Sequence, residues 1–151
     1  MPAGSYDLSM DQGEDFHLHL EYLDTENTVI GANPIDVSSY NLTKLQIRRA
    51  PSSKSILLSV GLTGCTSGGP TGEYVLGSSF EGLGGTGYIL LGKNEEGTGS
   101  LTGGIYIFVS GDTTKYIPAG RHFYEVELSK SGDINKLVRG RMDVIPEIVQ
   151  Q

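Results

Sequence analysis

The sequence contains no tryptophan and only one cysteine, Cys65, among its 151 residues. A single cysteine excludes an intramolecular disulfide. The residues on either side, Gly64 and Thr66, offer no basic group that would activate a catalytic thiol. We therefore expect Cys65 to be a small buried side chain.

Positive charge is also scarce, with 11 lysines and arginines against 18 acidic residues and a formal net charge of −7. Binding to nucleic acid or to an anionic membrane needs a basic surface, so neither partner is expected. No apolar run approaches the roughly 20 residues of a membrane-spanning helix. Residues 1–13 are polar and acidic, unlike a signal peptide.

The chain does contain many short segments with the pattern of β-strands, and no window of 11 or more residues has helical periodicity. In residues 121–128, Tyr124, Val126 and Leu128 should face the core, and the residues between them should face outward. Residues 104–109 are apolar on both faces, which predicts a central strand. The other segments with a strand pattern are 16–22, 44–48, 55–60 and 136–145. The pattern predicts one all-β domain over residues 1–151, an antiparallel sandwich or barrel.

Residues 61–104 differ from the rest, because fifteen of the 22 glycines lie there. We interpret this segment as a long hairpin or flap inserted into the domain, since so long a structureless loop is unusual. Glycine-rich chain is costly to order, so neighbouring subunits are expected to help. The segment has few charges, which suits packing against another protein. Its apolar side chains form a candidate interaction surface: Tyr74, Tyr88, Ile89, Leu90 and Leu91.

The C-terminal tail, residues 146–151, adds Ile148 and Val149 to the candidate interaction surface. An extended apolar end of this kind can add a strand to a neighbouring subunit. Alternatively, the tail is a final strand or strap of its own domain.

Two glycine motifs inside residues 61–104 resemble nucleotide-binding loops. Residues 82–87 fit G-x-G-x-x-G, but a strand-like run follows where a dinucleotide site needs a helix. Residues 87–94 approach a phosphate-binding loop, but Asn94 stands where that loop needs a serine or threonine. We therefore expect no cofactor.

Two pairs of side chains have the spacing of a possible metal site or catalytic site. His17 and His19 share a strand face and could bind a metal with a third ligand, either His122 or a carboxylate, or could share a metal with another subunit on a symmetry axis. Glu125 and Glu127 could lie at the separation of glycosidase carboxylates, and an enzymatic reading of the chain rests on this pair alone. In both cases a solvent-facing strand surface is the simpler interpretation, so we expect no metal site and no catalytic residue.

Four segments carry a resemblance to a known family: "DQGEDF" (11–16), "NPIDVSSY" (33–40), "KLQIRRAP" (44–51) and the stretch from "IPAGRHFYEVEL" to "DVIPEI" (117–148). Together they resemble small tailed-bacteriophage virion proteins with an immunoglobulin-like β fold, whose chains begin with an acidic strand like residues 11–16. The glycine-rich middle lies outside the matched segments. Residues 37–39 depart from the family pattern, because Ser39 replaces a turn glycine.

The resemblance implies a structural protein located in the virion, in the tail, the baseplate or the fibre-attachment region. Such a protein is expected to form a homo-oligomer, to bind other virion proteins and to have no enzymatic activity. One alternative is a decoration protein of the neck or head. Another is a module that binds host-surface glycan, with Tyr74 and Tyr88 as a solvent-facing platform.

Overall fold

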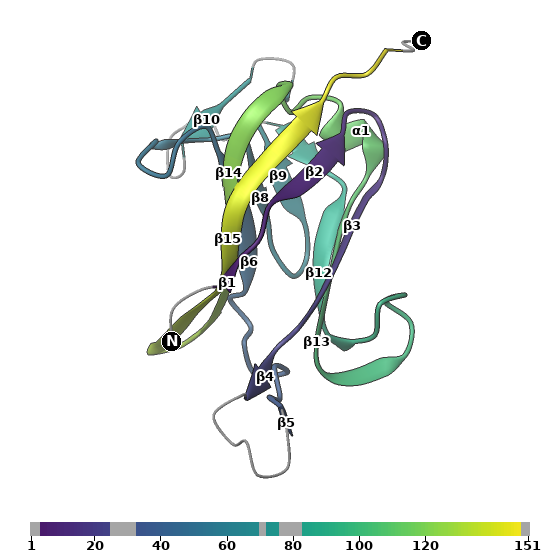
Figure 1. Ribbon diagram of the computed structural model, residues 1–151, viewed down its shortest axis with the longest axis vertical. Helices are drawn as coiled ribbons and strands as arrows, with labels where there is room; N and C mark the ends of the chain where they lie inside the picture. Colours follow the sequence, from purple (N-terminus) through teal and green to yellow (C-terminus); the bar gives the residue numbers. More distant parts are fainter. Residues whose placement is uncertain (1–3, 25–32, 70–71, 76–82, 149–151) are drawn as a thin grey trace.

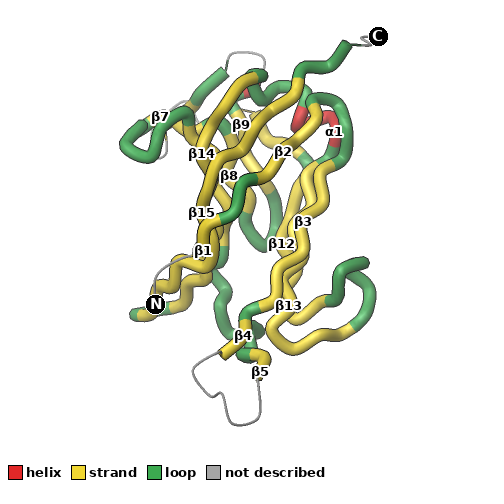
Figure 2. Tube along the Cα trace, viewed as in Figure 1, coloured by secondary structure: helices red, strands yellow, loops and turns green. Residues whose placement is uncertain are grey.

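The computed structural model describes residues 4–24, 33–69, 72–75 and 83–148. The described residues are mostly in strands, which confirms the predicted all-β class. The single helix among these residues, α1 (Gly111–Thr114), is one turn long and lies between two long strands. Figure 1 shows two layers of strands, and Figure 2 shows the same trace coloured by element.

The larger layer is an eight-stranded sheet in the order β1, β15, β14, β6, β8, β9 and β11, with β2 also beside β15. Its ladders are antiparallel except that β1 and β2 run parallel to β15. Its strands are β1 (Gly4–Ser5), β2 (Leu8–Asp11), β6 (Lys44–Arg48), β8 (Leu58–Val60), β9 (Cys65–Ser67), β11 (Leu83–Gly85), β14 (Gly120–Lys130) and β15 (Asp133–Ile145).

The smaller layer is a three-stranded antiparallel sheet in the order β12 (Gly87–Lys93), β13 (Ser100–Val109) and β3 (Phe16–Glu21). The strand predicted over residues 104–109 is therefore central, as its two apolar faces indicated. Two short pairs complete the fold: β4 (Leu23–Asp24) with β5 (Asn33–Pro34), and β7 (Ser55–Ile56) with β10 (Tyr74–Val75).

The two sheets pack face to face on a common core. Fully buried residues of the larger sheet, such as Leu45 and Val126, belong to one cluster with Ile105 and Ile107 of the smaller sheet. Along β14 burial alternates as predicted, with Tyr124, Val126 and Leu128 inside. Cys65 is 8% exposed, and burial raises the pKa of its thiol.

The glycine-rich segment is not a flap set apart from this frame. Residues 87–104 provide β12 and the first half of β13, two of the three strands of the smaller sheet. Glycine is needed where they approach closely, since a Cβ on Gly104 would lie 1.9 Å from the carbonyl oxygen of Lys93. The predicted long hairpin is therefore present in these residues, but it forms part of the sandwich itself and is not an insertion outside the frame. Part of the segment, 70–71 and 76–82, lies outside the described residues.

The N-terminal region also differs from prediction. Residues 11–16, expected to begin a strand, mostly form the turn between β2 and β3, and Gly13 there has a φ of 83°. The strands precede this turn, in residues 4–11, which lie along the edge of the larger sheet at β15. We call residues 4–11 the edge segment.

Hydrogen bonds attach the edge segment to the larger sheet. The amide of Tyr6 donates to the carbonyl oxygen of Arg139 at 3.0 Å, and the amide of Arg141 donates to the carboxylate of Asp7 at 3.0 Å. The hydroxyl of Tyr124 donates to the carbonyl oxygen of Tyr6 at 2.6 Å. Met10, 1% exposed, is the buried apolar side chain of the segment.

The turn after the edge segment is fixed by α1 and its surroundings. The hydroxyl of Thr114 accepts from the amide of Gly13 and donates to the carbonyl oxygen of Glu14. The side chain of Gln12 donates to the carbonyl oxygen of Ile117. The edge segment is thus attached to the larger sheet along its length, and the turn that follows it is attached to α1 and Ile117.

Candidate interaction surfaces

The outer face of the smaller sheet carries a row of rings. Tyr88, Phe108 and His17 lie directly opposite one another on β12, β13 and β3. The ring centroids of Tyr88 and Phe108 are 5.3 Å apart, and those of Phe108 and His17 are 5.2 Å apart. Tyr106 lies beside this row, with its hydroxyl 2.5 Å from Nδ1 of His17. We call these four residues the aromatic face.

The hairpin between β12 and β13 folds back on this surface. The side-chain oxygen of Asn94 accepts from the amides of Glu96 and Thr98, which closes the turn. Gly97 lies so close to the ring of Tyr106 that a Cβ there would be 2.9 Å from a ring carbon. Burial raises the pKa of the Tyr106 hydroxyl. The rings of Tyr88 and Phe108 remain half-buried and His17 is exposed, so this part of the aromatic face is accessible.

The outer face of the larger sheet contains a hollow of about 660 Å³, which we call the charged hollow. Its long or charged side chains come from β6, β14 and β15: Lys44, Gln46, Arg48, Phe123, Glu125, Glu127, Lys136 and Arg139. Four of these are cationic and two are anionic, in a chain whose net charge is −7. The charged hollow is thus a locally basic region of an acidic protein.

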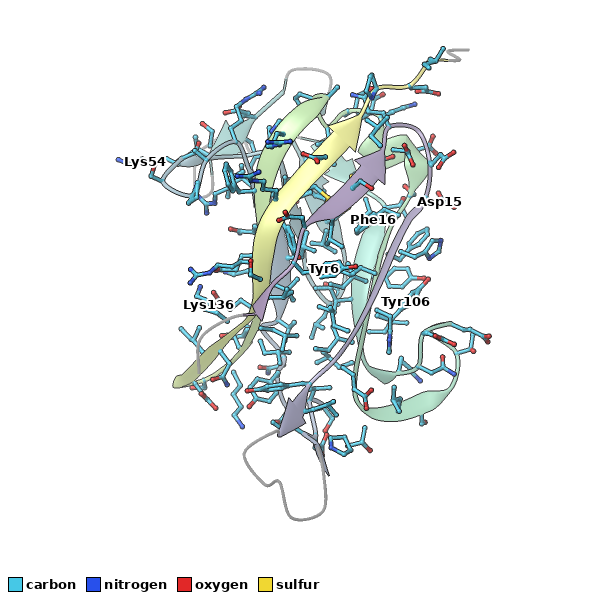
Figure 3. All side chains as sticks on the ribbon, viewed as in Figure 1. Tyr6, Asp15, Phe16, Lys54, Tyr106 and Lys136 are labelled. Carbon is cyan, nitrogen blue, oxygen red and sulfur yellow. The ribbon has the colours of Figure 1, made fainter. Side chains whose placement is uncertain are left out.

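Lys136 connects the two carboxylates of the charged hollow. Its Nζ lies 2.9 Å from Oε1 of Glu125 and also contacts the carboxylate of Glu127. These hydrogen bonds, first that to Glu127 and then that to Glu125, raise the pKa of Lys136. Figure 3 labels Lys136 beside the larger sheet, on the opposite side of the molecule from Tyr106. Glu125 and Glu127 therefore share Lys136 as a partner.

A β-bulge explains why Lys136 reaches this face. Val126 pairs with Val138 while Glu127 pairs with Lys136, so Leu137 is an extra residue in β15. Without the extra residue, Lys136 would share the inward face of Val138, because side chains alternate along a strand. The bulge reverses that parity and places Lys136 opposite Glu127.

The residues predicted as an interaction surface do not lie together. Tyr74 is 2% exposed and pairs with Ile56, so the expectation that it faces solvent is wrong. Ile89 is 1% exposed and belongs to the core, and Leu91 packs against the core. Tyr88 and Leu90 occupy positions on the outer face of β12.

The tail contributes differently. Ile148 is 94% exposed, and Val149 lies outside the described residues.

The aromatic face contains Tyr106 and Phe108, which the sequence did not single out as site residues. The only signal for them was the apolar character of both faces of residues 104–109, and nothing in the sequence gave their register against Tyr88 and His17.

The histidine pair takes part in local contacts. Nε2 of His19 lies 3.0 Å from the carbonyl oxygen of Lys93, and a carbonyl accepts, so this nitrogen carries the proton. Within the described part of the chain, no group of three or more His, Cys, Asp or Glu side chains has the geometry to hold a metal ion. A further ligand for the pair would have to come from elsewhere.

Comparison of the sequence with models of protein families and with curated protein sequences finds no match. Among the residues that the structure describes, no helix has the length and apolarity needed to span a membrane.

Proposed function

We propose that the chain is a structural protein of a bacteriophage virion, an immunoglobulin-like module of the tail, baseplate or fibre-attachment region that acts by protein–protein assembly. The proposal is motivated by the resemblance to such proteins of four segments, residues 11–16, 33–40, 44–51 and 117–148. The observation that supports its immunoglobulin-like fold is the order of the strands in the two sheets.

The strand order supports an immunoglobulin-like topology. In that fold, strands G, F, C and C′ form one sheet and strands D, E and B form the other. If β3 is taken as strand B, the chain order makes β6 strand C, β8 strand C′, β12 strand D, β13 strand E, β14 strand F and β15 strand G. The larger sheet then contains the run G-F-C-C′, with β1 and β2 beside G and β9 and β11 beyond C′, and the smaller sheet reads D-E-B.

The surfaces support assembly as the mode of action. The aromatic face and the charged hollow lie on the outer faces of opposite sheets, so one copy can contact two neighbours. The side-chain pairs with catalytic potential are engaged in structural contacts, Glu125 and Glu127 with Lys136, and His17 with Tyr106. Large apolar side chains are exposed elsewhere, including Tyr6, Ile134 and Ile148. These features suit a binding module better than an enzyme.

Mass spectrometry and electron microscopy of purified particles of the phage that encodes the chain would test this proposal. We expect the protein in intact particles at a fixed stoichiometry, with its density in the tail or baseplate. Absence of the protein from washed particles would overturn the structural role. Density in the neck or head would instead favour the alternative of a decoration protein.

The aromatic face favours a second candidate, binding of host-surface glycan, because sugar rings stack on exposed aromatic side chains. The platform would consist of Tyr88 and Phe108, since Tyr74 is buried. A glycan array followed by titration of any bound sugar would test it. The Tyr88→Ala variant should lose binding, while Tyr116→Ala, an exposed tyrosine elsewhere, should retain it. An array without signal would remove this candidate.

A further inference from the structure

Strand β3 leaves one edge of the smaller sheet open. It pairs with β13 on one side, and no strand of the described residues pairs with its other side. The amide of Tyr22 donates to the carbonyl oxygen of Gly103, so even-numbered residues of this strand face β13. Because such bonds alternate along an antiparallel ladder, the backbone groups of His17, His19 and Glu21 point to the open side.

The edges at β15 and at β12 are protected from such pairing. The edge segment covers β15, and it is itself interrupted at Tyr6 and Asp7. Strand β12 changes register between Leu91 and Lys93, and the amide of Ile89 donates to the carbonyl oxygen of Gly61 near the larger sheet. Charges, bulges and interruptions of this kind prevent pairing with other chains. Strand β3 has no proline or lysine, and its ladder with β13 is regular over all six residues.

The open edge also leaves apolar surface uncovered. Leu18 and Leu20 face the core but are only half-buried, although Ile107 and Ile105 opposite them are fully buried. A strand added at this edge would extend the inner face and cover them. Edge strands with unpaired backbone groups are templates for this kind of addition.

The sequence of β3 is complementary to itself. In an antiparallel pair centred on His19, residue 17 of one copy lies opposite residue 21 of the other. His17 is then opposite Glu21 twice, which pairs an imidazole with a carboxylate, and Leu18 is opposite Leu20 on the inner face. Centring the pair on Leu18 instead would bring Asp15 opposite Glu21, and like charges directly opposite are unfavourable.

We propose that the open edge of β3 binds β3 of a second copy of this chain, antiparallel and centred on His19, to form a continuous six-stranded sheet across a two-fold axis. The pairing has three hydrogen-bonded residue pairs: 17 with 21, 19 with 19 and 21 with 17. The two aromatic faces then lie side by side on the outer surface of the joined sheet. The inference rests on the proposed role as an assembly module and names the partner of that role.

Sedimentation velocity over a range of protein concentrations measures the dimer, and hydrogen exchange locates it. We expect a monomer–dimer equilibrium in which the amides of His17, His19 and Glu21 become protected as the dimer forms. The His17→Glu variant puts glutamate opposite Glu21 of the second copy at both ends of the interface, and should weaken the dimer roughly tenfold. Glu21→Lys should weaken it less.

An equimolar mixture of the two variants tests the register. The Glu21→Lys chain presents lysine opposite the new glutamate of the His17→Glu chain, so the mixture should form heterodimers more tightly than either variant forms homodimers. A centre on Leu18 gives no such rescue, because residue 17 then faces residue 19. Thermal unfolding of each variant shows whether the monomer remains folded. Since the rescue occurs between chains, a folding defect cannot produce it.

Ser9→Lys is the matched control, because it adds a charge to the exposed side of β2 at the edge of the other sheet. It should leave the dimer unchanged. The proposal is overturned if the protein stays monomeric at millimolar concentration, if Ser9→Lys weakens the dimer as much as His17→Glu, or if the mixture gives no rescue. If the protein is found in phage particles but is monomeric in solution, the proposed function stands and the dimer is disproved. If it forms the dimer but is absent from particles, the dimer stands and the proposed function is disproved.

Discussion

The edges of the two sheets that meet at the turn of residues 12–15 are treated in opposite ways. At the larger sheet, the edge segment covers β15 and is fixed by backbone bonds, the Tyr124 hydroxyl and the buried side chain of Met10. At the smaller sheet, β3 follows the turn at once, and no other strand among the described residues pairs with its second side. Residues 4–21 therefore cover the edge of the larger sheet and form the uncovered edge of the smaller one. The stability of the covered edge depends on a few contacts that can be removed one at a time.

The largest effect should come from Met10→Ala. This change removes the buried apolar anchor of the edge segment, and truncating a buried methionine costs about 2–5 kcal/mol of unfolding free energy. Leu8→Ala, at a half-buried position of the same strand, is the control and should cost less. Denaturant unfolding measures both. Equal effects at the two positions would show that Met10 is not the anchor.

Gly140→Ala should be the next most harmful change. A Cβ at this position would lie 2.0 Å from the carbonyl oxygen of Tyr6, so the edge segment must shift away from β15. We expect a loss of about 1–3 kcal/mol, the usual cost of overpacking. Gly4→Ala is the control, because its Cβ would be 3.6 Å from the carbonyl oxygen of Leu137, an ordinary contact. Unfolding of the two variants should differ clearly.

Thr114→Val tests the turn between the two edges. The hydroxyl of Thr114 bonds the amide of Gly13 and the carbonyl oxygen of Glu14, and valine keeps the shape without these bonds. The loss should be about 1–2 kcal/mol, with faster hydrogen exchange at Gly13. Thr113→Val is the control, because it removes the hydrogen bond from the amide of Thr86. In this variant hydrogen exchange should become faster at Thr86 and stay unchanged at Gly13.

Tyr124→Phe should have the smallest effect, about 1 kcal/mol near neutral pH, because it removes one hydrogen bond to Tyr6. Burial raises the pKa of Tyr124 to about 12, against about 10 in an unfolded chain. The unfolded state therefore loses its proton first, and this contribution to stability is complete below pH about 10 and is lost as the pH rises through about 12.

The pH dependence gives the Tyr124 test a second readout. Between pH about 10 and about 12, the stability of the Phe variant should fall less steeply than that of the original chain. Tyr40→Phe is the control, because the ring of Tyr40 lies under Nζ of Lys130, away from the edge segment. Parallel pH profiles for the Tyr124 variant and the original protein would contradict the assignment.

Much of the fold could be predicted because burial follows alternation in the long strands. The inward residues of β14 and the central place of β13 were both evident from the apolar pattern. The edge segment was missed because it is polar and its attachment uses backbone bonds to β15, far along the chain, with Met10 as its only fully buried apolar side chain. Such long-range pairing leaves no periodic signal in residues 4–11.

The candidate surfaces were less predictable than the fold. Tyr74 and Tyr88 were grouped because both lie among glycines, yet one is buried against β7 and the other is on an outer face. The aromatic face depends on the register between three strands, which no local pattern specifies. The contact of Lys136 with Glu125 and Glu127 depends on a bulge that alternation alone would exclude.

That bulge affects which changes of length β15 can accept. Deleting Leu137 would restore a regular ladder and leave every remaining side chain on its present face. Deleting a residue elsewhere in the strand, such as Arg141, would turn the residues on one side of the gap to the wrong face. Residue 137 is therefore the position at which this long strand can be shortened during evolution or design without exchanging its inner and outer surfaces.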